Sequence, residues 1–280
     1  MRADGKRLKN IDPMYTVGAY IMDKRVDSMN MVTIDIPIEP IKKYLNEKRK
    51  QGTPMSHLAV LIAAYLRTTA EYPLLNRFIV NRRAYARNEF CVSMVVLKSG
   101  EIDNGTMAKM HFEMDDTVFD VNKTIVDFIE ENRNTPENNA TEKMLKILLR
   151  IPCILPLGIG MFRFMDKHGL LPKKLIDISP FHNSLVISDL ISIRTNHIYH
   201  HTYEFGTTSV VVTMGNLREV PCRKGDEIEF ERCIPLGIEV DDRICSGSYL
   251  ALAFQRMRQY LKNPALLESA PEKVNIDPGI

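Results

Sequence analysis

This sequence of 280 residues has little excess of charge of either sign. Its 37 basic and 35 acidic residues are well mixed and leave a net charge of +2. A protein that binds nucleic acid through phosphate contacts needs a basic surface, and no RNA- or DNA-binding motif is present. A glycine-rich phosphate loop is missing too, because Gly158-Ile159-Gly160 alone is too short to indicate one. The composition therefore gives no support for nucleic-acid binding.

The sequence also lacks paired cysteines. Its five cysteines form no CxxC motif and leave one over in any pairing; they are Cys91, Cys153, Cys222, Cys233 and Cys245. This pattern predicts reduced thiols in a cytoplasmic protein. Cys245 is a conceivable nucleophile, but a small residue packing inward fits its place in a turn better.

No apolar run is long enough to span a membrane. The most apolar region is Leu145–Met165, in which Ile151–Phe162 carries no charge. Pro152 and Pro156 interrupt this stretch, and it is shorter than the roughly 20 residues that a span needs. We expect a buried helix followed by a loop, with a mouth for an acyl substrate or a lipid-contacting patch as alternatives. The basic start Met1–Asn10 is not followed by the apolar segment of a signal peptide.

The most informative segment that is present is Pro235–Gly247, P-L-G-I-E-V-D-D-R-I-C-S-G. It predicts a buried strand that ends in a turn, followed by a helix over Tyr249–Leu261. Apolar spacing and β-formers predict further elements, namely helices over Ser56–Glu71 and Thr117–Asn132 and strands over Arg77–Val80 and Phe90–Leu97.

Pro235–Gly247 resembles the active-site segment of the chloramphenicol acetyltransferase and dihydrolipoamide acyltransferase superfamily, whose signature is HxxxDG. On that signature Asp242 stands where the catalytic histidine should be, and Ser246 stands where the aspartate should be. Arg243 and Gly247 complete the motif turn. The resemblance covers roughly Val26–Leu266.

Two other segments carry the same resemblance. Tyr72-Pro73-Leu74-Leu75-Asn76 is similar to the H-P-x-L-N segment of the dihydrolipoamide acyltransferases. The stretch Ser179–Leu190 resembles the strand whose serine donates a hydrogen bond to the oxyanion of the tetrahedral intermediate, and Ser188 falls on that position.

The resemblance implies an α/β fold like that of chloramphenicol acetyltransferase, with a mixed sheet covered by helices on one face. It implies an N-terminal arm over 1–25, one acyltransferase-like domain over 26–266 and an exposed tail over 267–280. It also implies a homotrimer in which Asp242 faces Ser188 of a neighbouring subunit. No cofactor would be bound permanently, and a coenzyme A thioester would be a co-substrate.

The missing histidine bears on the chemistry. The family histidine removes a proton from a thiol or hydroxyl, and an ordinary aspartate, with a pKa of about 3.9, is a much weaker base. The adjacent carboxylate of Asp241 would make Asp242 a better base if both side chains shared one site. In the family the replaced aspartate pairs with an arginine near the N-terminus, and no arginine occurs around Asp12–Tyr15, so both members of that pair are replaced.

Other residues are candidates for the missing base. His200 and His201 lie between the Ser188 strand and the next strand, in an interval that borders the family's active-site channel, and His182 is a further candidate. His197, His200 and His201 form the pattern H-x-x-H-H. No carboxylate or cysteine lies at a metal-ligand spacing from them, so we predict no metal site.

Two functions therefore stay open. The first is a coenzyme A-dependent acyltransferase whose standard activity is weak or absent. The second is a non-catalytic trimeric relative that binds a small molecule or a partner.

Overall fold

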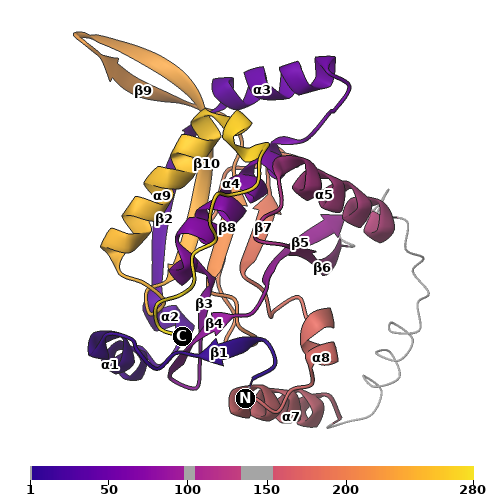
Figure 1. Ribbon diagram of the computed structural model, residues 1–280, viewed down its shortest axis with the longest axis vertical. Coiled ribbons are helices and arrows are strands. Elements are labelled where there is room, and N and C mark those ends of the chain that lie inside the picture. Colours follow the sequence, from indigo (N-terminus) through magenta and orange to yellow (C-terminus); the bar gives the residue numbers. More distant parts are fainter. Residues whose placement is uncertain (1, 98–104, 134–153) are drawn as a thin grey trace.

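The computed structural model describes residues 2–97, 105–133 and 154–280. Within them, the main sheet has the strand order β2-β10-β8-β7-β5-β6, and β9 pairs with β10 beyond this row (Figure 1). The strands are β2 (Met29–Pro37), β5 (Phe90–Leu97), β6 (Gly105–Phe112), β7 (Leu185–Asp189), β8 (Val210–Met214), β9 (Arg218–Lys224) and β10 (Glu227–Asp241). The sheet is mixed, because β5, β7 and β8 run parallel and the other pairs are antiparallel.

Helices cover one face of this sheet, as predicted (Figure 1). They are α3 (Ile38–Lys50), α4 (His57–Glu71), α5 (Val118–Arg133) and α9 (Gly247–Lys262), and the 3-10 turns η1 (Pro73–Asn76) and η2 (Pro264–Leu267) adjoin them. The central helix α4 is buried almost throughout and packs against α5 and α9. Alternate residues of β10, Leu236, Ile238 and Val240, point into this core, so the residues between them face the opposite side.

The local sequence signals located these elements well. The predicted helices over 56–71 and 117–132 correspond to α4 and α5, and the predicted helix over 249–261 lies within α9. The predicted strands over 77–80 and 90–97 are β3 (Arg77–Val80) and β5. The structure places a further strand, β4 (Arg83–Arg87), between them, and β3 pairs with β4.

The N-terminal residues form part of a second, smaller sheet. Its strand order is β1-β4-β3, and β1 (Gly5–Arg7) joins residues of the predicted arm to the body. Arg2 and Asp4 are buried and form an ion pair of 2.9 Å between Nε and Oδ1. Two short helices, α1 (Pro13–Ile21) and α2 (Arg25–Ser28), follow before β2 begins.

The C-terminal segment 267–280 was predicted to be an exposed tail. Most of its side chains are exposed, but Asp277 is buried. Its carboxylate forms an ion pair with Arg77 of β3, and the main-chain N–H of Asn275 donates to the carbonyl of Ala70 in α4. These contacts hold the segment against the domain.

The prediction of a buried helix followed by a loop in the apolar region is wrong over the described part. Residues 154–168 form one continuous helix, α7 (Ile154–His168), whose apolar side chains are mainly exposed; Leu157 and Met161 are 73% and 61% exposed. The helix lies apart from the main core, beside α8 (Lys173–Ile178) and the N-terminus (Figure 1). Residues 145–153 of the apolar region lie outside the described residues. No helix in the described ranges is long and apolar enough to cross a membrane.

Candidate functional site

Asp242 is the first residue after β10, and contacts with the end of α2 and the start of β2 fix it. Its main-chain N–H donates to the carbonyl of Ser28 at 2.7 Å, and its Oδ1 accepts a hydrogen bond from Nδ2 of Asn30 at 2.7 Å. The side chain is half-buried. The carboxylate at the histidine position of the family signature is therefore held by an amide donor.

The neighbouring carboxylate of Asp241 does not share a site with Asp242. Asp241 is fully buried and accepts two hydrogen bonds from the guanidinium of Arg243, at 2.8 and 2.7 Å. Burial lowers the pKa of Arg243, but the hydrogen bonds and charge of Asp241 outweigh it, and the net pKa is raised. The condition under which Asp241 would make Asp242 a better base, one shared site, is therefore not met, because Asp241 is paired with Arg243.

The other two positions of the motif turn begin helix α9. Ser246 is its N-cap, and its hydroxyl accepts a hydrogen bond from the N–H of Tyr249 at 3.2 Å. Gly247 is exposed, and a side chain there would meet nothing within 4 Å. An arginine does support the turn, since Nη1 of Arg77 donates to the carbonyl of Ile244 at 3.2 Å.

Cys245 packs inward in this turn, as predicted. It is 2% exposed, and burial raises the pKa of its thiol to about 12. Because a thiolate is the nucleophilic form, Cys245 is unsuited to act as a nucleophile. Cys153 lies outside the described residues, and the other four cysteines are free thiols.

Ser188 lies near the end of β7 and lines an open groove of about 520 Å³. The groove is mainly apolar, with walls from α4, β5 and α5 that include Leu58, Met94 and Ile129. Its size is within the range of small-molecule sites, roughly 300 to 1,000 Å³. Ser188 thus places a hydroxyl at the edge of a surface that can hold an apolar chain.

One chain does not bring Ser188 and Asp242 together. Ser188 pairs with Thr213 of β8, and Thr213 pairs with Gly237 of β10. Gly237 precedes Asp242 by five residues, which corresponds to ~17 Å along the strand. A site that uses both residues needs them from two different chains.

The histidine candidates lie on the segment between β7 and β8. Nδ1 of His200 is 3.2 Å from the carbonyl oxygen of His201, and their ring centroids are 5.0 Å apart. No ion pair joins either ring to a carboxylate of the described residues. Burial and the nearby charge of Arg218 lower the pKa of His197, whose Nε2 lies 3.2 Å from Oγ1 of Thr33.

The segment between β7 and β8 crosses the sheet on the face opposite the helices, and its backbone at His197 and Ile198 lies very close to the strands. A Cβ atom on Gly215 would lie 2.1 Å from the main-chain nitrogen of His197, and one on Gly237 would lie 2.5 Å from the carbonyl oxygen of Ile198. Both positions therefore exclude any side chain while the segment keeps this path. In the described parts of the chain, no group of three histidine, cysteine or acidic side chains is placed to hold a metal ion.

His182 is buried within a different cluster. Its Nδ1 lies 2.8 Å from Oγ of Ser179, and its Nε2 lies 3.2 Å from Oδ1 of Asp166. The same carboxylate accepts a hydrogen bond of 2.7 Å from Arg2. These contacts tie α7 to the N-terminus, and His182 does not line the groove at Ser188.

The structure adds one pair that the sequence did not indicate, His57 and Asp189. Nε2 of His57, at the start of α4, lies 3.5 Å from Oδ2 of Asp189, which directly follows Ser188. The other oxygen of Asp189 accepts a hydrogen bond from the N–H of Ile191 at 3.1 Å, which fixes the carboxylate. Nε2 of His57 makes no hydrogen bond within the described residues, so Asp189 is a close acidic neighbour of the ring, and His57 adjoins Leu58 of the groove.

The fold is that of the acyltransferase catalytic domains represented by chloramphenicol acetyltransferase and the dihydrolipoamide acetyltransferase cores. The probable dihydrolipoamide acetyltransferase of Listeria monocytogenes has 11% identity and a TM-score of 0.58, over 92% of this chain and 94% of its own. The dihydrolipoamide acetyltransferase of Azotobacter vinelandii has 11% identity and a TM-score of 0.59, over 93% of each chain. A chloramphenicol acetyltransferase has 12% identity and a TM-score of 0.54, over 92% of this chain and 99% of its own.

These identities are low, and the likeness is one of fold. No protein-family model and no curated protein sequence matches this chain. The fold class predicted from Pro235–Gly247 and the Ser188 strand is confirmed.

Proposed function

We propose that this protein transfers an acyl group from a thioester donor, such as an acyl-coenzyme A, to an acceptor that carries a hydroxyl or thiol. The observation that carries this proposal is the position of Ser188 at the edge of an apolar groove, in a domain with an acyltransferase fold. The groove would take the acyl chain, and the Ser188 hydroxyl would donate a hydrogen bond to the oxyanion.

The proposed base is His57, with Asp189 as its positioning residue. With a proton on Nε2, the nitrogen nearer to Asp189, the ring would use the lone pair on Nδ1 to take the acceptor's proton. The acceptor oxygen or sulfur then bonds to the thioester carbonyl carbon, and the carbon–sulfur bond breaks as the intermediate collapses. The leaving thiolate takes the proton back from the imidazole, so the reaction needs no further co-reactant.

In this proposal the standard family reaction is weak or absent, because Asp242 replaces the histidine. Asp242, His200 and His201 remain the alternative bases, and Asp242 would work together with a Ser188 supplied by another subunit of a homotrimer. A cytoplasmic location, which accords with the free cysteines, belongs to the same proposal.

The test is release of free thiol from a panel of acyl-coenzyme A compounds, with candidate hydroxyl and thiol acceptors. His57→Ala should reduce turnover by ~10² or more, whereas Asp242→Asn, His200→Ala and His201→Ala should have little effect. His111→Ala is a matched control, because His111 lies 3.4 Å from Glu89 in a similar exposed pair away from the groove. Loss of turnover in one of the other three variants alone would reassign the base.

A specific observation favours the second function, a non-catalytic relative that binds a small molecule or partner. Asp242, Arg243 and Ser246 each have a complete structural role in the motif turn. Binding without catalysis would be supported by a ligand that raises the melting temperature and is recovered unreacted. The rise in melting temperature should then be the same for the unmodified protein and for the His57→Ala, Asp242→Asn, His200→Ala and His201→Ala variants.

A further inference from the structure

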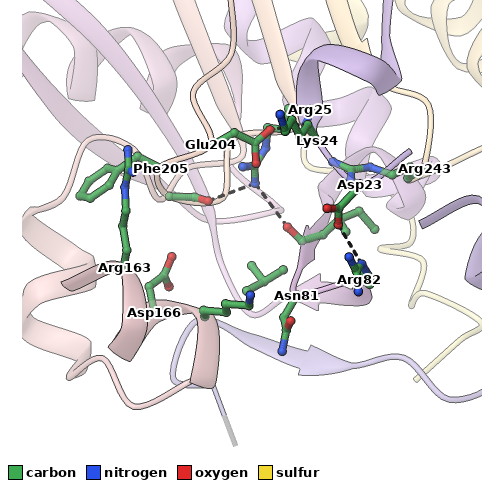
Figure 2. A pocket seen from close by; sticks show the side chains of 14 residues that line it. Asp23, Lys24, Arg25, Asn81, Arg82, Arg163, Asp166, Glu204, Phe205 and Arg243 are labelled. Atoms are coloured by element: carbon green, nitrogen blue, oxygen red, sulfur yellow. Dashed lines mark hydrogen bonds and ion pairs between the residues drawn. The ribbon is translucent and has the colours of Figure 1, made fainter. Parts of the chain in front are cut away.

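A cavity of about 370 Å³, distinct from the groove at Ser188, opens between α7, the β3–β4 turn and the segment around Phe205 (Figure 2). Fourteen residues line it. Six of them are basic and three are acidic, so the lining carries an excess of three positive charges. The whole protein has a net charge of only +2, so this cavity concentrates positive charge.

Three of the six basic side chains already have partners. The buried guanidinium of Arg25 donates to four main-chain carbonyl oxygens at 3.0 to 3.3 Å. Arg243 is paired with Asp241, as described above. Arg82 lies 2.8 Å from Asp23, an ion pair that Figure 2 shows at one side of the cavity.

The other two acidic residues of the lining are also engaged. Asp166 accepts a hydrogen bond from Arg2, which comes from outside the cavity. The Glu204 carboxylate accepts a hydrogen bond from the main-chain N–H of Arg25. The charge of Glu204 also offsets that of the Arg25 guanidinium, which has only neutral carbonyl oxygens as hydrogen-bond partners, so the lining keeps an excess of three cations.

Those remaining cations are Lys24, Arg163 and Lys167. All three are exposed, and none forms an ion pair within the described residues. Arg163 and Lys167 are four residues apart on α7, so they share one face of the helix, where like charges destabilise it slightly. Arg163 lies over the ring of Phe205, with its guanidinium carbon 5.9 Å from the ring centroid, and both side chains border the cavity (Figure 2).

We propose that this cavity binds a small molecule through a phosphate monoester or diphosphate group. An arginine fork and lysine ammonium groups are the side chains that bind phosphate oxygens best, and a dianion would offset the unpaired charge of Lys24, Arg163 and Lys167. The volume fits a small molecule. This inference does not rest on the proposed acyl transfer, because the cavity and the groove at Ser188 share no residue.

Inorganic pyrophosphate is the probe, and isothermal titration calorimetry is the measurement. Pyrophosphate should bind the unmodified protein with one site, and the affinity should fall as salt rises. The double variant Arg163→Gln with Lys167→Gln should weaken binding by ~10-fold or more, since it removes two charged donors. The matched control is Arg223→Gln with Lys224→Gln on the exposed β9–β10 hairpin, which changes net charge equally and should leave the affinity unchanged.

Further titrations define the source of the phosphate. If coenzyme A displaces pyrophosphate, coenzyme A is one molecule whose phosphate groups the cavity binds. If a simple sugar phosphate displaces it, the cavity binds phosphate esters in general. Either result supports the proposed site. Absence of pyrophosphate binding at millimolar concentration would overturn the proposal. Equal losses in the double variant and its control, or tighter binding of citrate than of pyrophosphate, would overturn it as well.

Discussion

Arg77 and Asp277, which are 200 positions apart, form a bidentate ion pair in the interior. The distances are 2.6 Å from Nε to Oδ2 and 2.7 Å from Nη2 to Oδ1, and the side chains are 5% and 3% exposed. The third donor of Arg77 reaches the carbonyl of Ile244. One arginine therefore joins the C-terminal segment to the motif turn.

Asp277→Ala should lower the free energy of unfolding by ~3 to 5 kcal/mol, because it leaves a buried guanidinium without its counter-ion. Urea denaturation measures the change. Asp226→Ala is the control, because its pair with Arg223 is exposed and its loss should leave stability nearly unchanged. Equal effects of the two variants would contradict a structural role for the C-terminal segment.

Glu239 of β10 should make stability depend on pH. It has no exposed surface, its carboxylate oxygens have no hydrogen-bond partner among the described residues, and burial raises its pKa to about 8. The native state keeps this proton between about pH 4.5 and 8, whereas the unfolded state releases it. The contribution of Glu239 to stability is therefore fully present below about pH 4.5 and is lost as the pH rises toward 8.

Glu239→Met should raise the free energy of unfolding at pH 7 by about 3 kcal/mol. The gain is about 1.4 kcal/mol for each pH unit above 4.5, the ordinary pKa of a glutamate side chain. The gain should shrink toward zero near pH 4.5. Denaturation at several pH values measures it, with the exposed Glu219→Met as the control. A gain that is constant from pH 4.5 to 8 would show that Glu239 ionises normally in the folded protein.

Ser188→Ala should reduce kcat on the true substrate by ~10² to 10³, with KM and the melting temperature nearly unchanged, because an oxyanion donor acts mainly in the transition state. Ser192→Ala, in the same groove, is the matched control. Steady-state kinetics separate the two parameters. A change in KM alone would make Ser188 a ligand-binding residue.

Acetyl transfer from acetyl-coenzyme A to chloramphenicol or dihydrolipoamide should be very slow in the unmodified protein, because Asp242 is a poor base. Asp242→His combined with Ser246→Asp should raise that rate by ~10² to 10⁴. Asp242→His alone should give less, because Ser246 remains a helix cap. Rapid turnover of these two substrates by the unmodified protein would refute the claim that its base is impaired.

The protein should be a trimer in solution, as the resemblance to the acyltransferase superfamily implies, and in a trimer Ser188 of one chain could face Asp242 of another. Sedimentation equilibrium gives the mass. A monomer at micromolar concentration would exclude a shared site and leave the pair of His57 and Asp189, which one chain completes by itself.

Local sequence patterns located the elements of the fold, whereas the site depends on contacts that no pattern contains. The strands over 77–80 and 90–97 follow from runs of β-formers. Asn81 and Arg82, both with positive φ, form a tight turn between β3 and β4. The polar residues at this turn were interpreted only as a connection, so the strand β4 that follows it was missed.

The candidate site was predicted only in part, for the same reason. Ser188 was placed from its flanking residues, and the structure sets it in a groove. His57 and Asp189 meet through the packing of α4 on the sheet, and the direction of Asp241 toward Arg243 is a matter of side-chain geometry. The exposure of the apolar side chains of α7 could not be predicted either, because the apolar pattern of a helix does not indicate which element it packs against.

The path of the segment that carries His197 and His200 has a consequence for how this protein can vary. Gly215 and Gly237 leave no room for even one methyl group beneath the crossing backbone. Substitutions on the segment itself are unconstrained at its exposed positions, whereas any substitution at these two glycines must lift the segment from the sheet. An exposed side chain such as that of His201 can therefore be exchanged for another, but the half-buried His197 cannot be exchanged freely, and the path of the segment is fixed by two residues that have no side chain.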